Sequence, residues 1–205
     1  SEVADTVALI RDRVGSHLIV DADTGYGNAL NVARTVRMFE RAGANAIQIE
    51  DQDFPKRCGH LDNKALIPAQ EMIGKIKAAL DSRQSRETLV IARSDAIAVE
   101  GFEKAMARAV SYREAGADIL FVEAPKTREE LKRIPPALKG VPVMANMVEG
   151  GKTPSLNTAD LQALGFSLVI FPGAIVRAVA RTAGEFYESL AANGTSEPFR
   201  NRMYD

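Results

Sequence analysis

Short apolar runs alternate with longer amphipathic segments along the whole chain. Runs rich in valine, isoleucine and leucine, without strict alternation, are typical of parallel strands that are covered on both faces. The intervening segments carry apolar residues at three- and four-residue steps, which indicates amphipathic helices. The pattern predicts strands at 17–22, 45–50, 88–93, 118–123, 141–146 and 167–172, and its clearest helices at 31–42, 69–80, 102–115 and 174–191.

A weak internal repeat indicates an α/β architecture. Residues 42–50 (AGANAIQIE) match residues 115–123 (AGADILFVE), and 164–171 (LGFSLVIF) is a looser copy. Each copy places glycine where a helix ends and the next strand begins. Such units build an open doubly wound sheet or a (β/α)₈ barrel, and no G-x-G-x-x-G fingerprint follows the first strand to favour the open sheet. We predict one domain over 1–205, a (β/α)₈ TIM barrel with about six of its eight units present.

Composition and charge narrow the classes of function. The 205 residues are 46% hydrophobic and 26% charged, with a formal net charge of −1, which argues against disorder and gives no electrostatic reason to expect nucleic acid as a partner. No run approaches the roughly 18 apolar residues of a membrane span, and the N-terminal residues do not resemble a signal peptide, so no membrane partner is expected. A single cysteine, Cys58, excludes an internal disulfide framework and fits a reducing, cytoplasmic location.

Polar side chains gather where the predicted strands end. In a parallel α/β fold these ends share one face, which carries the active site. Clustered carboxylates repel one another and need a cation, and Mg²⁺ with oxygen ligands meets that need. Solvated strand ends and helix caps would explain any one of these residues, but they explain several successive strands less well. The residues are Asp21, Asp23, Glu50, Asp51, Arg93, Asp95, Glu123 and Asn146.

Two long loops follow predicted strands. The first, 51–68, contains Lys56-Arg57-Cys58-Gly59-His60, and long loops at the catalytic face of a barrel are often lids. Flanking positive charge lowers the pKa of a thiol, so Cys58 is a candidate for proton transfer or nucleophilic attack; the alternative is an ordinary surface cysteine in a basic loop. The second, 146–155, has glycines and hydroxyls suited to an anion, although a plain turn has the same composition.

These motifs together resemble the isocitrate lyase/phosphoenolpyruvate mutase superfamily, closest to its 2-methylisocitrate and 2,3-dimethylmalate lyase branch. The resemblance covers essentially the whole chain in order, through DADTGYG (21–27), IEDQ (49–52), KRCGH (56–60), ARSDA (92–96) and FVEAP (121–125). It implies a TIM barrel that acts on 2-oxo or 2-hydroxy acids and depends on Mg²⁺, with Mn²⁺ as the alternative ion. It also implies a homotetramer in which a C-terminal helix is exchanged between neighbours.

The resemblance assigns roles residue by residue. Asp21 and Asp23 resemble the metal-site aspartates, and Glu50 resembles the residue that holds a metal-bound water. Arg93 resembles the residue that grips a substrate carboxylate, and Cys58 resembles the acid that protonates the departing carbanion in the lyase branch. The full prediction has Cys58, Glu50, Arg93 and His60 as catalytic residues, Arg93, Glu123, Asn146, Ser155 and Gly59 as substrate-binding residues, and Asp21, Asp23 and Glu50 at the metal.

The sequence departs from the family pattern in three places. Ser94 stands where the family usually has threonine, which keeps the hydroxyl. The family's first two strands precede the segment that begins at Ser1, and they supply a Ser-Gly substrate-binding turn and a further aspartate near the metal. We also expect the exchanged C-terminal helix to be absent beyond Asp205.

The sequence therefore predicts a Mg²⁺-dependent carbon–carbon lyase. Its expected substrate is a small 2-hydroxy di- or tricarboxylate of the alkylmalate or 2-methylisocitrate type, cleaved to pyruvate or a related 2-oxo acid plus a carboxylate. The alternatives are an oxaloacetate hydrolase or decarboxylase, a phosphoenolpyruvate or carboxyphosphoenolpyruvate phosphonomutase, and a non-catalytic fragment.

Overall fold

A computed structural model describes residues 1–59 and 63–204. In this part of the chain six parallel strands form one sheet in sequence order, each hydrogen-bonded to the next. Each strand overlaps one of the predicted runs, so the α/β alternation is confirmed. The strands are β1 (Ile19–Asp21), β2 (Ala46–Glu50), β3 (Leu89–Ser94), β4 (Ile119–Val122), β5 (Val143–Asn146) and β6 (Leu168–Ile170).

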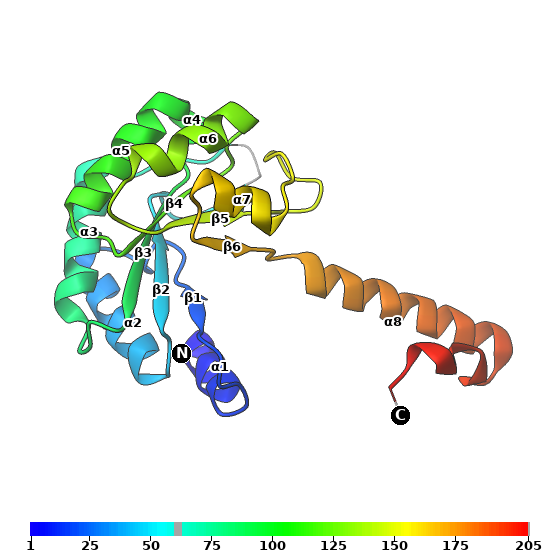
Figure 1. Cartoon of the computed structure of the whole chain (residues 1–205). Coiled ribbons are helices and arrows are strands. Elements are labelled where there is room, and N and C mark those ends of the chain that lie inside the picture. The colour runs from blue at the N-terminus through cyan, green and yellow to red at the C-terminus, as the bar shows by residue number, and fades with distance from the viewer. Residues whose placement is uncertain (60–62, 205) are drawn as a thin grey trace.

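Helices connect the strands and cover the outer face of the sheet. Figure 1 shows α2, α3 and α5 side by side along that face, and the three helices contact one another in that order. The four predicted helices are present with shifts of up to two residues at their ends, whereas α1, which precedes the first strand, was not predicted. The helices are α1 (Glu2–Arg11), α2 (Ala29–Arg41), α3 (Ala69–Ser82), α4 (Ile97–Glu100), α5 (Phe102–Glu114), α6 (Arg128–Ala137), α7 (Thr158–Leu164), α8 (Ala174–Asn193) and the 3₁₀ helix η1 (Glu197–Arg202).

The sheet is a curled half-barrel. β1 and β6 form its two edges, and within the described residues they are not paired with each other. Figure 1 shows the strands curving around the inner face, with the helices outside. Six parallel strands in this order fit the predicted partial TIM barrel, because a closed barrel of this kind has eight.

Successive side chains along each strand point to opposite faces of the sheet, so the core has an outer and an inner layer. The larger buried cluster lies between the sheet and its helices, and a smaller cluster lies on the inner face. The inner cluster is built from Ala46, Ile91, Ile119, Phe121 and Met144. Residues two or four positions after these apolar residues point to the same inner face. They include the polar residues at the strand ends.

Glycines end three helices of the internal repeat, as predicted. Gly43, Gly116 and Gly165 have φ angles of 100°, 100° and 101°, in the left-handed region that favours glycine. A Cβ at Gly43 would lie 2.8 Å from Cγ of Arg11. The turn after α2 therefore needs glycine for its backbone conformation and for the close approach of α1.

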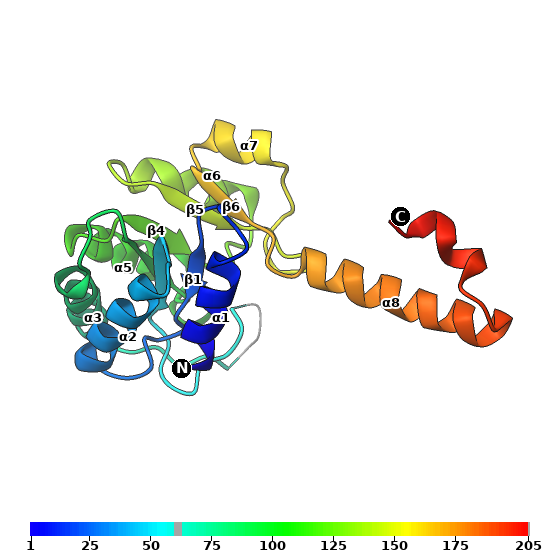
Figure 2. The same ribbon diagram turned by 90° about the horizontal axis from the view of Figure 1, so that it is seen from below.

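The helix predicted at 174–191 is present as α8, but it does not pack on the sheet as the helix of a sixth β/α unit would. None of its residues is buried, and both views show it projecting away from the half-barrel with η1 at its far end (Figures 1 and 2). Its periodic apolar face therefore does not pack on the sheet. Although α8 is the longest helix in the described residues, neither it nor any other described helix is both long and apolar enough to cross a membrane.

Candidate active site

Four predicted residues converge at the carboxyl ends of adjacent strands. Glu50 ends β2, Arg93 lies opposite it near the end of β3, and the two residues are register partners. Arg93 Nε lies 3.3 Å from Glu50 Oε2. Asn146, at the end of β5, donates from Nδ2 to both carboxylate oxygens of Glu123 at 3.3 Å. The structure therefore brings these four side chains to one end of the inner face.

Within this cluster, contacts with Asp95 and Phe121 hold Arg93 in a fixed orientation. Its Nε and Nη2 donate to the two carboxylate oxygens of Asp95, at 2.9 and 3.1 Å, and its guanidinium lies 5.1 Å from the ring centre of Phe121. Burial would lower the pKa of Arg93, but Asp95, Glu123 and Glu50 outweigh burial and hold it above its ordinary value. The site thus keeps a permanent positive charge of the kind that binds a carboxylate.

Glu50 is a buried carboxylate with few neutralising contacts. It is fully buried, and neither carboxylate oxygen has a hydrogen-bond partner among the described residues. Burial raises its pKa to about 8, with Arg93 and Lys56 acting in the opposite direction. Lys56 Nζ lies 3.7 Å from Glu50 Oε1 and 2.6 Å from Asp23 Oδ1, so its ammonium stands between the two carboxylates.

The two predicted metal-site aspartates lie at the end of β1: Asp21 is the last residue of the strand, and Asp23 lies in the turn that follows. Asp21 Oδ1 accepts a hydrogen bond from the backbone nitrogen of Asp23 at 2.9 Å, and Asp23 has a left-handed φ of 49°. Lys75 from α3 supports this turn by donating to the carbonyl of Thr24 at 3.0 Å. The turn therefore directs carboxylates to the same end of the sheet as Glu50.

These residues fit a hydrated Mg²⁺ ion better than a closed cage of protein ligands. Among the described residues, no three histidine, cysteine or acidic side chains are grouped closely enough to ligate a metal directly. Mg²⁺ in proteins commonly keeps several waters and binds through one or two carboxylates. The unpartnered oxygens of Glu50 and the cationic Lys56 beside Asp23 indicate that positive charge is needed here.

The Cys58 loop lies directly on Arg93 and Glu123. At its base, the backbone nitrogen of Asp53 donates to the carbonyl of Ala65 at 2.9 Å, and an antiparallel bridge joins Gln52 to Leu66. A Cβ at buried Gly59 would lie 2.5 Å from Arg93 Nη2 and from Glu123 Cγ. Cys58 itself is exposed and free, and His60 lies outside the described residues.

The second polar loop contributes less than predicted from its composition. Asn146, at its start, contacts Glu123, but Ser155, at its end, is exposed. The buried hydroxyl of this loop is Thr153, whose Oγ1 has no hydrogen-bond partner among the described residues. The assignment of Ser155 to the substrate stays a prediction.

Three charged residues make contacts in the site that the sequence prediction did not include. Lys56 was expected to act on the neighbouring thiol, but its ammonium contacts Asp23 and Glu50. Asp95 orients Arg93, and its place two residues beyond Arg93 at a strand end was the available signal. Lys64, also buried, donates to Asp95 Oδ1 at 3.0 Å and to the carbonyl of Gly59, a pairing across the fold that no local pattern indicates.

Comparison with known proteins agrees with this geometry. The family model described as phosphoenolpyruvate phosphomutase matches residues 1–191. The chain belongs to this family. It is 43% identical over 203 residues to 2,3-dimethylmalate lyase of Eubacterium barkeri, and 47% identical over 204 residues to a 2-methylisocitrate lyase of Aeropyrum pernix. The matches cover 99% and 100% of this chain but 70% and 65% of those relatives, so the chain spans about two thirds of their length.

Solved structures of the family share the fold. A crystal structure of 2,3-dimethylmalate lyase, described as a PEP mutase/isocitrate lyase superfamily member, matches with a TM-score of 0.90 at 37% identity, over 95% of this chain and 66% of that one. Oxaloacetate acetylhydrolase with 3,3-difluorooxalacetate matches with 0.90 at 32% identity, over 95% and 67%. Phosphonopyruvate hydrolase with oxalate and Mg²⁺ matches with 0.86 at 33% identity, over 98% and 70%.

Proposed function

We propose that this chain provides the active site of a Mg²⁺-dependent carbon–carbon lyase that cleaves a 2-hydroxy di- or tricarboxylate of the dimethylmalate or 2-methylisocitrate type. One observation carries the proposal. The loop that bears Cys58 places Gly59 against Arg93 and Glu123, so the thiol-bearing loop and a carboxylate-binding guanidinium belong to one site. The names of the two relatives, at 43% and 47% identity, support the choice of substrate class.

The residues divide the reaction between binding and proton transfer. Arg93, fixed by Asp95, binds a substrate carboxylate in a two-pronged contact. As the 2-hydroxyl gives its proton to a general base and becomes a carbonyl, the C2–C3 bond breaks and its electron pair stays on C3. The thiol of Cys58 then donates the proton that C3 takes up. Glu123 and Asn146, which contact each other, line the pocket beside Arg93.

Asp21, Asp23 and Glu50 are the residues that would hold the metal, with Mn²⁺ as the alternative ion. When bound, Mg²⁺ supplies a positive charge that stabilises the oxygen from which the proton leaves. Lys56 contributes a second positive charge beside Asp23 and Glu50. The phosphonopyruvate hydrolase structure with oxalate and Mg²⁺ supports this choice of ion.

The test is release of a 2-oxo acid from 2,3-dimethylmalate, 2-methylisocitrate and isocitrate, and consumption of oxaloacetate, each measured with Mg²⁺ and with chelator. A lyase should release the acid from one of the first three, and lose activity with chelator and in Cys58→Ser. Arg86→Ser, an exposed change in the turn before β3, is the control and should leave the rate unchanged. No turnover of any of the four acids would instead favour a non-catalytic fragment.

Oxaloacetate hydrolysis is the second candidate, because oxaloacetate acetylhydrolase matches the fold with a TM-score of 0.90. Decarboxylation of oxaloacetate and phosphonomutase chemistry rank behind these two candidates. Turnover of oxaloacetate alone in the same panel would assign the site to the second candidate. Release of oxalate together with acetate would identify hydrolysis, whereas carbon dioxide would identify decarboxylation.

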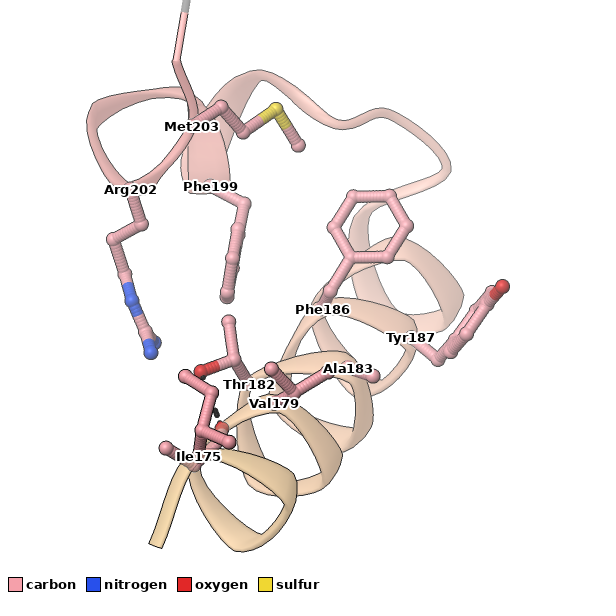
Figure 3. A pocket seen from close by; sticks show the side chains of 10 residues that line it. Ile175, Val179, Thr182, Ala183, Phe186, Tyr187, Phe199, Arg202 and Met203 are labelled. Carbon is pink, nitrogen blue, oxygen red and sulfur yellow. Dashed lines mark hydrogen bonds between the residues drawn. The ribbon is translucent and has the colours of Figure 1, made fainter. Parts of the chain in front are cut away.

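We further propose that the protein is a cytoplasmic homotetramer. A free, exposed thiol fits a reducing compartment. The projecting helix α8, rather than a segment beyond Asp205, has the exposure expected of a helix that is exchanged between neighbours. Figure 3 shows the apolar groove between α8 and η1, lined on α8 by Ile175, Val179 and Phe186 and on η1 by Phe199.

A further inference from the structure

A buried polar network lies behind the proposed site, on the side of α5. At its centre is Asp51, the residue after β2, which is fully buried. Asp51 Oδ2 accepts from Ser94 Oγ at 2.8 Å and from the hydroxyl of Tyr112 at 2.7 Å, and Oδ1 accepts from the backbone nitrogen of Asp95 at 2.8 Å. This one carboxylate therefore joins the ends of β2 and β3 to helix α5.

Two residues of α5 reach the network because they lie one helical turn apart. Arg108 and Tyr112 are at positions i and i+4, which places them on the same face of a helix. Arg108 Nη1 lies 3.3 Å from the hydroxyl of Tyr112 and 3.5 Å from Asp51 Oδ2. Its Nε and Nη2 donate to Glu100 at 2.8 and 3.0 Å, which fixes the guanidinium between α4 and the sheet.

The same residues hold both ends of the Cys58 loop. Ile67, near the end of the loop, donates from its backbone nitrogen to the carbonyl of Asp51 at 3.0 Å. Arg108 Nη1 donates to the carbonyl of Ile67 at 3.0 Å. The two ends of the loop are thus fixed to each other and to helix α5.

The network continues directly into the substrate-binding arginine. Asp51 fixes the Ser94–Asp95 pair, and Asp95 in turn receives both donated hydrogen bonds from Arg93. Burial raises the pKa of Asp51, and the hydrogen bonds from Asp95, Tyr112 and Ser94 act against that rise. Removing one donor leaves a buried carboxylate partly unsatisfied, which is costly enough to shift its neighbours.

We propose that Tyr112 and Arg108 are positioning residues for the lyase site: they act through Asp51 to orient Arg93 and to set both ends of the Cys58 loop. This inference rests on the proposed function, because it gives the network a role in carboxylate binding. It adds two residues from an outer helix that touch none of the proposed metal-site aspartates. Tyr112 and Arg108 should therefore affect the binding of a carboxylate much more than the binding of Mg²⁺ alone.

The difference between carboxylate and metal binding provides the test. We expect Tyr112→Phe, which keeps the buried ring and removes the hydroxyl, to weaken oxalate binding in saturating Mg²⁺ about tenfold, as measured by calorimetry. The KM for the cleaved acid should rise by a similar factor, while the dissociation constant for Mg²⁺ alone stays within twofold. Tyr204→Phe, on a fully exposed side chain, is the matched control and should change none of these values.

Two variants test Arg108, and a third guards against loss of folding. Arg108→Met should lower kcat as well as raise KM, because it releases Ile67, and Arg108→Lys should recover part of the loss. Ser94→Ala removes another donor from the same oxygen of Asp51, so it should weaken oxalate binding as Tyr112→Phe does. It takes the place of Tyr112→Phe if that variant fails to fold. Far-UV circular dichroism checks the fold of each.

The outcomes separate this inference from the proposed function. Oxalate affinity in Tyr112→Phe and Ser94→Ala within twofold of wild type would overturn the positioning role, and so would equal weakening of oxalate and Mg²⁺. In either case the lyase proposal stands if the wild-type chain cleaves its substrate. A wild-type chain that neither binds oxalate nor cleaves any acid would overturn both.

Discussion

The backbone of Gly59 lies against the guanidinium of Arg93, so closely that a Cβ at position 59 would come within 2.5 Å of Nη2. Glycine is needed here for space, because the nearest atoms belong to side chains that are themselves buried. The loop that carries Cys58 can reach the proposed substrate carboxylate only because residue 59 has no side chain. This contact is thus one of those that set the distance between the proposed proton donor and the proposed anion-binding group.

Replacing Gly59 should therefore impair activity more than stability. We expect Gly59→Ala to lower kcat/KM about a hundredfold, because a displacement of about 1 Å in a catalytic group has effects of that size. Gly74→Ala is the control: its Cβ would meet open space in α3, and alanine should stabilise that helix by about 0.5–1 kcal/mol. Steady-state kinetics and thermal unfolding of both variants check this, and an active Gly59→Ala would contradict the contact.

Glu50 should make the stability of the metal-free protein depend on pH. Its pKa is about 8 in the folded chain, above the ordinary 4.5. The folded state therefore keeps the proton to higher pH than the unfolded state does. The free energy of unfolding should fall as pH rises from about 4.5 to about 8, by at most about 1.4 kcal/mol per unit. Urea unfolding in chelator across this range measures the slope.

Two comparisons assign that slope to Glu50. Glu50→Gln should flatten it and raise the stability of the metal-free protein at pH 8, while the exposed control Glu87→Gln should keep it. Saturating Mg²⁺ should also flatten the slope in wild type, because a bound cation favours the ionised carboxylate. A slope that persists in Glu50→Gln would assign the pH dependence to another group.

The alternation of residues along the strands made part of the site predictable. Side chains alternate between the two faces of a strand, so a residue two or four positions after an inner-face apolar residue also lies on the inner face. This holds for Glu50, Arg93, Glu123 and Asn146. Parallel strands bring their carboxyl ends together, so the sequence positions of these four residues were enough to place them in one site. The same apolar runs also predicted the six strands of the half-barrel.

Long side chains and long-range packing were not predictable in this way. Lys56 has a flexible stem that can reach several neighbours, and only the fold decides that Asp23 and Glu50 receive its charge. Lys64 reaches Asp95 across 31 positions of sequence. Helix α8 has the periodicity of a packed helix, but periodicity records only that one face is apolar, and it does not identify the surface that covers that face.

Arg93 should be intolerant even of lysine. Lysine keeps the charge but loses the fork that binds Asp95, and it leaves buried carboxylates less well satisfied. We expect Arg93→Lys to lower the free energy of unfolding by roughly 2–3 kcal/mol and to weaken oxalate binding. Arg133→Lys is a matched control, since Arg133 also pairs with a carboxylate and lies over an aromatic ring, but on the surface. Urea unfolding measures the free energy of unfolding of both variants. Equal losses in Arg93→Lys and Arg133→Lys would contradict the importance of burial.

The apolar groove on α8 should decide the state of assembly. Val179 lines the groove and its side chain is 59% exposed, so Val179→Lys would place a charge in a surface that we propose to be covered by other copies of the chain. Sedimentation should show four chains in wild type and smaller species in Val179→Lys, because burying an unpaired charge at an apolar interface is costly. Ala180→Lys adds the same charge one residue further on, outside the groove, and should leave the tetramer intact. A wild type that sediments as a monomer, or a Val179→Lys variant that stays tetrameric, would rule out this groove as the interface.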